Sequence, residues 1–147
     1  MDQRTLIGEA VGQQVWAVVG ASNDRGKFGN RIYRVMRDAG YRVYPVHPTL
    51  KEVEGDLAFA RLTDLPERPD VADIVVPAQI GMTIAKDAAA AGIPYFWLQP
   101  GAESDELIDH ASSLGLKVIH NACAMVEKRT WPAGPARSSS SNKKSFS

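Results

Sequence analysis

"AVVGASNDRGKFGNRIYRVMRDAGYRVYPVHP", residues 17–48, combines an apolar run, a glycine-containing turn, an amphipathic segment and a second apolar run. That order is typical of a strand, a helix and a parallel strand. The alternation continues after residue 48, where short apolar runs are separated by segments with helical spacing. We therefore predict a Rossmann-like α/β fold: an open, mostly parallel sheet of about five strands with helices on both faces.

The predicted strands are rich in β-branched and aromatic residues and almost continuously apolar, as strands covered on both faces are. They are Val15–Val19, Tyr41–Val46, Ile74–Val76, Tyr95–Leu98 and Lys117–Ile119, with a shorter candidate at Leu57–Phe59. Three helical segments between them end at glycines, namely Gly40, Gly92 and Gly115, as helices commonly do. A short helix around Leu6–Val11 is expected to lie across the sheet.

Composition narrows the class of protein. The chain has 147 residues, equal numbers of basic and acidic side chains (17 each) and a single cysteine. A zero net charge argues against nucleic-acid or membrane-surface partners, and one cysteine suits a reducing compartment. No run approaches the ~20 apolar residues of a membrane span, and the N-terminus lacks a basic leader. We expect a soluble cytoplasmic protein with a helical segment at 1–14, one folded domain at 15–131 and a disordered serine-rich tail at 132–147.

The loop after the first predicted strand runs from Gly20 to Asn30, and we expect the helix to begin after Asn30. At about ten residues it is longer than the usual strand-to-helix connection. A helix starting there directs unpaired N–H groups and a partial positive charge at a ligand, so phosphate is the natural guest. Ser22 offers a hydroxyl, and Arg25 and Lys27 offer mobile cations. The alternative is a plain connection with both cations solvated.

The side chains beyond this loop are less informative. Arg31, Arg34 and Arg37 lie opposite the apolar stripe of the helix and are expected to form a solvated face.

A nicotinamide dinucleotide is not favoured, because Ser22 replaces the second glycine of the Gly-x-Gly-x-x-Gly fingerprint and the second strand ends without a carboxylate. A P-loop is excluded by the absence of Gly-Lys-Ser/Thr at the right spacing.

Five motifs in order point to a family. The segments "VVGAS…K…G", "GYRVYPVHP", "VADIVVPA", "FWLQPGA" and "GLKVIHNACAMVE" resemble the small CoA-binding proteins. They are also similar to the CoA-binding N-terminal domain of the succinyl-CoA synthetase α subunit and of ADP-forming acyl-CoA synthetases. The resemblance spans Val15 to Lys128 and implies that residues 15–131 bind CoA or an acyl-CoA.

The resemblance also implies which residues meet the ligand. Those around the phosphates and the start of the pantetheine arm are Gly20, Ala21, Ser22 and Lys27. Those beside the adenosine and the 3′-phosphate are Pro45, Val46, His47, Pro48 and Lys51, with His47 standing where asparagine is common. Pro77 and Ala78 match the ligand-binding turn after the third strand. The turn that lines the pantetheine path is matched by Leu98, Gln99, Pro100 and Gly101. CoA carries three phosphates, which Arg25, Lys27 and Lys51 are suited to neutralise.

Catalysis is not expected from these residues. In the resembling synthetases the phosphorylated histidine belongs to a later domain, and His47, His110 and His120 do not replace it; His110 is expected to be solvated. Cys123 follows the last strand, where a ligand's thiol end would arrive, although a purely structural role is the alternative. His120 and Cys123 are too few for a closed zinc site.

Three functions therefore stay open. The first is a non-catalytic CoA binder, carrier or sensor, alone, as a homo-oligomer or with a partner subunit. The second is an NADP-type Rossmann enzyme or the nucleotide-binding subunit of a split acyl-CoA synthetase. The third is an interaction protein that keeps the fold without the ligand.

Overall fold

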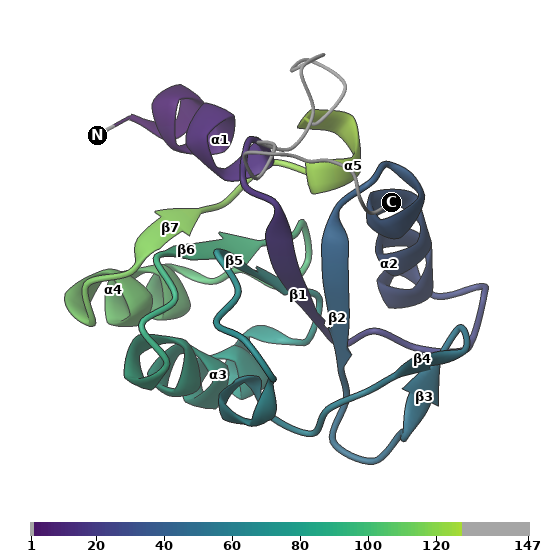
Figure 1. Cartoon of the computed structure of the whole chain (residues 1–147). Helices are drawn as coiled ribbons and strands as arrows, with labels where there is room; N and C mark the ends of the chain where they lie inside the picture. The colour runs from purple at the N-terminus through teal and green to yellow at the C-terminus, as the bar shows by residue number, and fades with distance from the viewer. Residues whose placement is uncertain (1, 128–147) are drawn as a thin grey trace.

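The computed structural model describes residues 2–127, in which a single five-stranded sheet has the order β2-β1-β5-β6-β7 (Figure 1). Its strands are β1 (Val15–Val19), β2 (Arg42–Val46), β5 (Val71–Ile74), β6 (Tyr95–Leu98) and β7 (Lys117–Ile119). All neighbouring strands in this sheet are parallel. The predicted α/β fold is therefore confirmed. The expected domain end at residue 131 and the expected tail at 132–147 lie outside the described residues.

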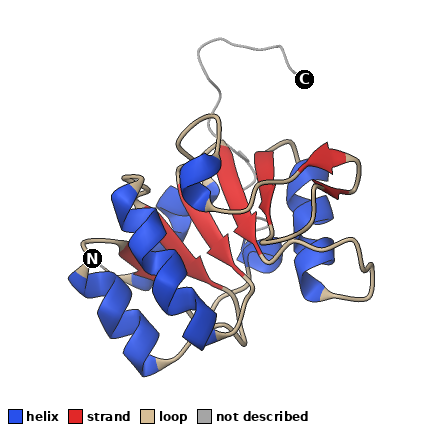
Figure 2. Cartoon of the chain, turned by 90° about the horizontal axis from the view of Figure 1, so that it is seen from below, coloured by secondary structure: helices blue, strands red, loops and turns tan. Residues whose placement is uncertain are grey.

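Helices cover both faces of the sheet, as Figures 1 and 2 show. One face carries α1 (Gln3–Val11), α2 (Phe28–Asp38) and α5 (Ala124–Glu127). The other carries α3 (Ala78–Ala90) and α4 (Asp105–Ser113), with the short 3-10 turn η1 (Leu62–Asp64). Alternation along β1 sends Trp16 and Val18 to the first face and Ala17 and Val19 to the second. No helix among residues 2–127 has the length and apolarity needed to cross a bilayer.

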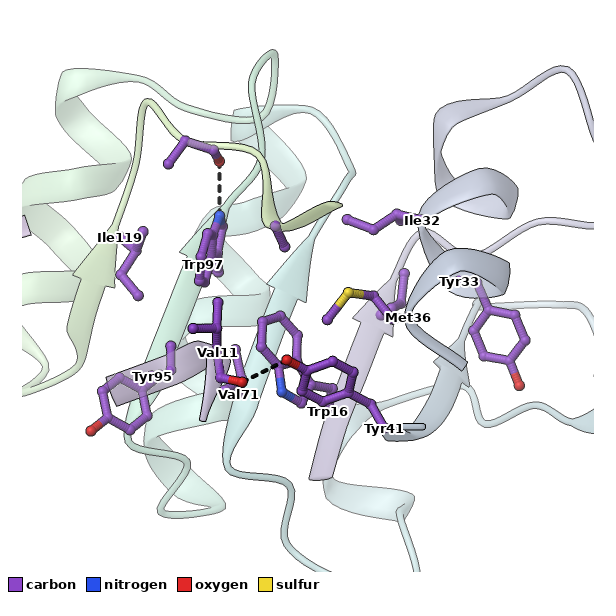
Figure 3. Close-up of a cluster of buried hydrophobic side chains, with 14 of the residues drawn as sticks. Val11, Trp16, Ile32, Tyr33, Met36, Tyr41, Val71, Tyr95, Trp97 and Ile119 are labelled. Atoms are coloured by element: carbon purple, nitrogen blue, oxygen red, sulfur yellow. Dashed lines mark hydrogen bonds between the residues drawn. The ribbon is translucent and has the colours of Figure 1, made fainter. Parts of the chain in front are cut away.

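The first face holds an aromatic core (Figure 3). The ring centroid of Trp16 lies 5.5 Å from that of Tyr41 and 5.6 Å from that of Trp97. Every polar atom of these rings has a partner: Trp16 Nε1 donates to the Gln13 carbonyl, Tyr41 Oη to the Val11 carbonyl and Trp97 Nε1 to the Ala122 carbonyl. Large aromatic area is thereby buried without an unpaired donor.

Several predicted boundaries need correction. The third core strand is β5, Val71–Ile74, and not Ile74–Val76. Val75 and Val76 continue the apolar run, but they lie past the end of the strand and line the turn beside Gly20. Helix α2 begins at Phe28, before the expected start after Asn30, so the connecting loop comprises only residues 20–27.

A small hairpin, β3 (Glu52–Val53) and β4 (Asp56–Leu57), stands apart from the main sheet. Its two turn residues, Glu54 and Gly55, have φ values of 51° and 83°, as a two-residue hairpin turn requires. The strand predicted at Leu57–Phe59 is wrong in extent, because Phe59 has left β4 and forms a single parallel bridge with Val46.

The order of the strands defines where a ligand would sit. From β1 the chain moves to β2 on one side, whereas β5 pairs with β1 on the other side. The carboxyl ends of β1 and β5 therefore flank the point where the strand order reverses, the usual ligand crevice of an open α/β sheet. There Gly20 has a φ of 103°, and a Cβ on it would lie 3.0 Å from side-chain atoms of Val75 and Val76.

The first turn of α2 approaches the end of β1 at backbone distance. A Cβ built on Gly29 would lie 2.1 Å from the carbonyl oxygen of Gly20. That oxygen belongs to the backbone, so it cannot rotate away as a side chain would.

We expect Gly29→Ala to destabilise the protein by about 3 kcal/mol or more, at or beyond the upper end of overpacking costs. The matched control is Gly12→Ala, at a φ of −82° with only ordinary contacts of 3.5 Å around the added methyl group. Urea unfolding of both variants measures the difference. Equal midpoints for the two variants would contradict the close approach.

Candidate functional site

Four turns lie side by side at one edge of the sheet, because β2, β1, β5 and β6 are parallel neighbours. This edge gathers the residues that sequence analysis assigned to a ligand. They are Gly20, Ala21 and Ser22 after β1; Pro45, Val46, His47 and Pro48 at the end of β2; Pro77 and Ala78 after β5; and Leu98, Gln99, Pro100 and Gly101 at the end of β6. A separate open groove of about 480 Å³ follows the outer edge of β2 and shares only Pro45 with this set.

The loop of residues 20–27 is held by its own short-range hydrogen bonds. Ser22 Oγ accepts from the Asp24 amide at 3.0 Å, and Asp24 Oδ1 accepts from the Gly26 amide at 2.9 Å. The Lys27 amide donates to the Asp24 carbonyl at 3.0 Å. The Ser22 hydroxyl is thus used as an acceptor by the loop and keeps its proton for a further partner.

Two helices begin at the switch point, the place between β1 and β5 where the strand order reverses. Neither helix has a side-chain cap at its N-terminus. The residues preceding α2 and α3, Lys27 and Pro77, provide no side-chain cap. By contrast, Asp2 caps α1 and Ser104 caps α4. Uncapped first-turn N–H groups and the positive end of the helix dipole favour an anion. The point between β1 and β5 where the strand order reverses is therefore flanked by two such ends.

The predicted cations differ in their surroundings. Arg25 is not a freely mobile cation, because its guanidinium pairs with Glu54, with an Nη2–Oε1 distance of 2.6 Å. Lys27 and Lys51 are exposed. Within residues 2–127, neither ammonium group takes part in an ion pair or a hydrogen bond. The uncompensated positive charge of the predicted site therefore comes from the two lysines.

Three other expectations about exposed side chains are corrected. Arg34 Nε donates to Asn30 Oδ1 at 2.7 Å, and Arg37 pairs with Asp56 at 2.9 Å, so these two do not form a simple solvated face. His110 is half-buried, and its Nε2 atom is shielded from solvent without a partner among the described residues.

Some of the predicted site residues have buried side chains. Ala21, Val46 and Leu98 belong to the apolar core, so they would offer a ligand only backbone atoms. The His47 ring supports the local backbone, because its Nδ1 accepts from the Thr49 and Leu50 amides, each at 3.1 Å. The assignment of these residues to the ligand stays a prediction.

Gln99 joins three elements through its buried side chain. Its Nε2 donates to Asp73 Oδ1 on β5, and its Oε1 accepts from the Ala124 amide at the start of α5. The amide group of Gln99 is thereby committed to the protein interior. We therefore treat Gln99 as a residue that positions the turn after β6.

Asp73 is the residue that sequence analysis missed. It is fully buried in the centre of the sheet, and its Oδ2 has no hydrogen-bond partner in the described chain. Burial raises the pKa of Asp73 to about 7, opposed only partly by the Gln99 hydrogen bond. The carboxyl inside the apolar run "VADIVV" was the available signal, but the predicted strand boundary left it outside the strand.

Cys123 lies between β7 and α5 and is half-buried. Its carbonyl accepts from the Val126 and Glu127 amides, which closes the single turn of α5. Neighbouring His120 donates its backbone amide to Gln3 Oε1 at 3.0 Å. A thiol contact with a ligand stays a prediction. No cluster of three or more His, Cys, Asp or Glu residues suited to a metal ion occurs among residues 2–127.

Comparison with known proteins identifies relatives of this arrangement. A family model described as a CoA binding domain matches residues 14–129. The uncharacterized protein YneT of Bacillus subtilis is 28% identical over 110 residues, covering 75% of this chain and 82% of that protein. A conserved hypothetical protein of Pyrococcus furiosus has a solved structure with a TM-score of 0.74 and 38% identity, covering 78% of this chain and 98% of that one.

A larger enzyme contains a similar segment. The ADP-forming acetate–CoA ligase I of Archaeoglobus fulgidus is 29% identical over 120 residues, covering 75% of this chain. The match covers 18% of the length of that ligase. The similarity is therefore confined to one part of the ligase.

The buried carboxyl of Asp73 makes stability depend on pH. Between its ordinary pKa of 3.8 and its native value of about 7, the native state holds a proton that the unfolded state has lost. The free energy of unfolding should therefore fall as pH rises through this window. At ~1.4 kcal/mol per pKa unit, the loss is at most about 4 kcal/mol.

We expect Asp73→Asn, which mimics the protonated acid, to gain stability over the wild type as pH rises from 5 to 8. The control is Asp109→Asn, an exposed acid on α4. Urea unfolding across this pH range measures both variants. A constant difference between Asp73→Asn and wild type would show that Asp73 does not titrate there.

Proposed function

Because this chain belongs to the CoA-binding domain family, we propose that it binds CoA or an acyl-CoA at the carboxyl ends of β2, β1, β5 and β6. The observation that carries the proposal is the pair of uncapped helix N-termini, α2 and α3, flanking the switch point beside the free ammonium of Lys27. This arrangement suits a phosphorylated ligand. The proposed role is that of a non-catalytic binder, carrier or sensor.

The proposed ligand position follows the order of the turns. The pyrophosphate would meet the first-turn amides of α2 and the Lys27 ammonium, and the Ser22 hydroxyl would donate its proton to a phosphate oxygen. The adenosine would lie by the turn after β2, with Lys51 toward the 3′-phosphate. The pantetheine arm would run past the exposed turns at Pro77 and Pro100 toward Cys123.

The ligase similarity supports a narrower statement than ligase activity. Since the ligase match covers 18% of that protein, the proposal extends to CoA binding and not to acyl transfer. An NADP enzyme is not favoured, because Ser22 and the carboxylate-free end of β2 lack the dinucleotide fingerprint. We place the protein in the cytoplasm, where CoA and a reduced single cysteine are compatible.

We expect CoA and acetyl-CoA to raise the melting temperature of the full chain. At ~100 times its dissociation constant a ligand adds ~2.7 kcal/mol to the free energy of unfolding. Differential scanning fluorimetry with each ligand at millimolar concentration measures the shift, with NADP as the comparison. A flat response to both CoA compounds would reject the proposed function, and a response to NADP alone would favour the dinucleotide alternative.

The position of the site is tested by reversing one charge. We expect Lys27→Glu to weaken CoA binding about tenfold or more, because a hydrogen bond to a charged group contributes ~1.5–3 kcal/mol. Lys86→Glu is the matched control, since Lys86 is an exposed lysine in the later part of α3. Isothermal titration calorimetry compares the two. Equal losses would place the ligand away from α2.

A further inference from the structure

Glu54 brings a carboxylate into the proposed phosphate site. It stands at the turn of the β3–β4 hairpin, and its side chain is 11% exposed, against 66% for Arg25. Its two oxygens take Arg25 Nη2 at 2.6 Å and Arg25 Nε at 3.2 Å. Asn30, which is fully buried on α2, donates Nδ2 to Glu54 Oε2 at 2.8 Å. These bonds, that of Arg25 first, lower the pKa of Glu54 to about 2, so the group is an anion at neutral pH.

The hairpin is anchored to the loop independently of this ion pair. The Glu54 amide donates to Asn23 Oδ1, and Asn23 Nδ2 donates to the Glu52 carbonyl, both at 2.9 Å. Arg37 Nη1 donates to the Glu54 carbonyl at 3.2 Å. The Glu54 carboxylate would therefore stay in place if Arg25 left it, because Asn30 still donates to the carboxylate and Asn23 and Arg37 hold the Glu54 backbone.

The ion pair changes what Arg25 offers to a ligand. A guanidinium bound side-on by a carboxylate is close to neutral as a unit, and a phosphate would accept the same two N–H groups that the carboxylate now accepts. Arg25 is the exposed partner on a long side chain, whereas Glu54 is nearly buried and anchored. An exchange of partners would thus move Arg25 and leave Glu54 behind.

Resting on the proposed function, we infer that Glu54 is an affinity-determining residue that competes with a ligand phosphate for Arg25. In the ligand-free protein Arg25 pairs with Glu54. When the phosphate of the ligand enters the loop, the guanidinium turns to the phosphate and the Glu54 carboxylate keeps its hydrogen bond from Asn30. Glu54 thereby holds the affinity for CoA below the value that Arg25 and Lys27 together would give.

The test is Glu54→Gln, which removes the charge and keeps an oxygen for Asn30. We expect CoA to bind about fivefold more tightly to this variant, the size of one partly exposed ion pair. The gain should shrink as sodium chloride is raised, because salt screens the released guanidinium charge. In the Glu54→Gln background, Arg25→Gln should remove the gain.

The matched control is Glu52→Gln, the same charge change on an exposed side chain of the same hairpin. It should alter the CoA affinity less than twofold. An equal gain in CoA affinity for Glu52→Gln would mean that removing any negative charge from the hairpin has this effect. Weaker CoA binding by Glu54→Gln would mean that Glu54 positions Arg25 for the ligand. Either result overturns the inference.

Inorganic pyrophosphate is titrated in parallel as a simple anionic probe. If wild-type protein does not respond to CoA but Glu54→Gln binds pyrophosphate more tightly than wild type, the proposed ligand is wrong. The inference that Glu54 competes with a phosphate for Arg25 would then still hold. If wild type binds CoA and Glu54→Gln binds it no better, only this inference fails. Unfolding curves of Glu54→Gln, compared with those of Glu52→Gln, verify that the hairpin variant is folded.

Discussion

The backbone contact between Gly20 and Gly29 fixes the geometry on which the candidate site depends. The Gly20 carbonyl occupies the space where any other residue at 29 would carry its Cβ. Helix α2 can therefore begin directly against the end of β1, and the loop of residues 20–27 must arch over that junction. The same contact places Asn30 where it can reach both the Ser22 carbonyl and the Glu54 carboxylate. A backbone approach of this kind has the same structural role as the close-packing glycine of dinucleotide folds, although its spacing differs.

The charged groups at this junction are of two kinds: some are already paired within the protein, and others are left to interact with a ligand. The open N-termini of α2 and α3 and the ammonium of Lys27 leave positive potential at the switch point. Glu54 and Asp56 lie next to it on the hairpin, and both are paired with arginines. The hairpin therefore supplies counterions that hold the Arg25 and Arg37 side chains in place. The ammonium groups of Lys27 and Lys51, by contrast, have no such partner among residues 2–127. The number of cations in a loop therefore does not give its attraction for an anionic ligand, because a cation that is paired with a carboxylate contributes less than an unpaired one.

The sequence predicts this protein well wherever one physical signal dominates. β1, β6 and β7 lie where the sequence predicts them, because their apolar β-branched and aromatic residues have no competing pattern, and Gly40, Gly92 and Gly115 mark the helix ends through their positive φ values. The strand predicted at Leu57–Phe59 is wrong in extent, and its partner β3 was not predicted, because two-residue strands have no periodicity to detect. The prediction for β5 is displaced because Asp73 interrupts an apolar run that continues into the turn.

The candidate site shows the same division. Strand order alone could place the four turns at one edge, since parallel strands share their carboxyl end. The ion pair between Arg25 and Glu54 could not be predicted, because the two residues are 29 positions apart and meet only when the hairpin folds back over the loop.

Asp73 and Gln99 form the buried contacts beneath the turn after β6. A carboxyl at the centre of a sheet is tolerated only if it is neutral or bonded, since a buried unpaired charge is costly. Here burial raises the pKa of Asp73 to about 7, and the Gln99 amide donates a hydrogen bond to its Oδ1. The carbonyl end of the same amide accepts from the first turn of α5. The turn after β6 is thereby tied to the segment that carries Cys123. One buried chain of hydrogen bonds thus links β5 through β6 to α5.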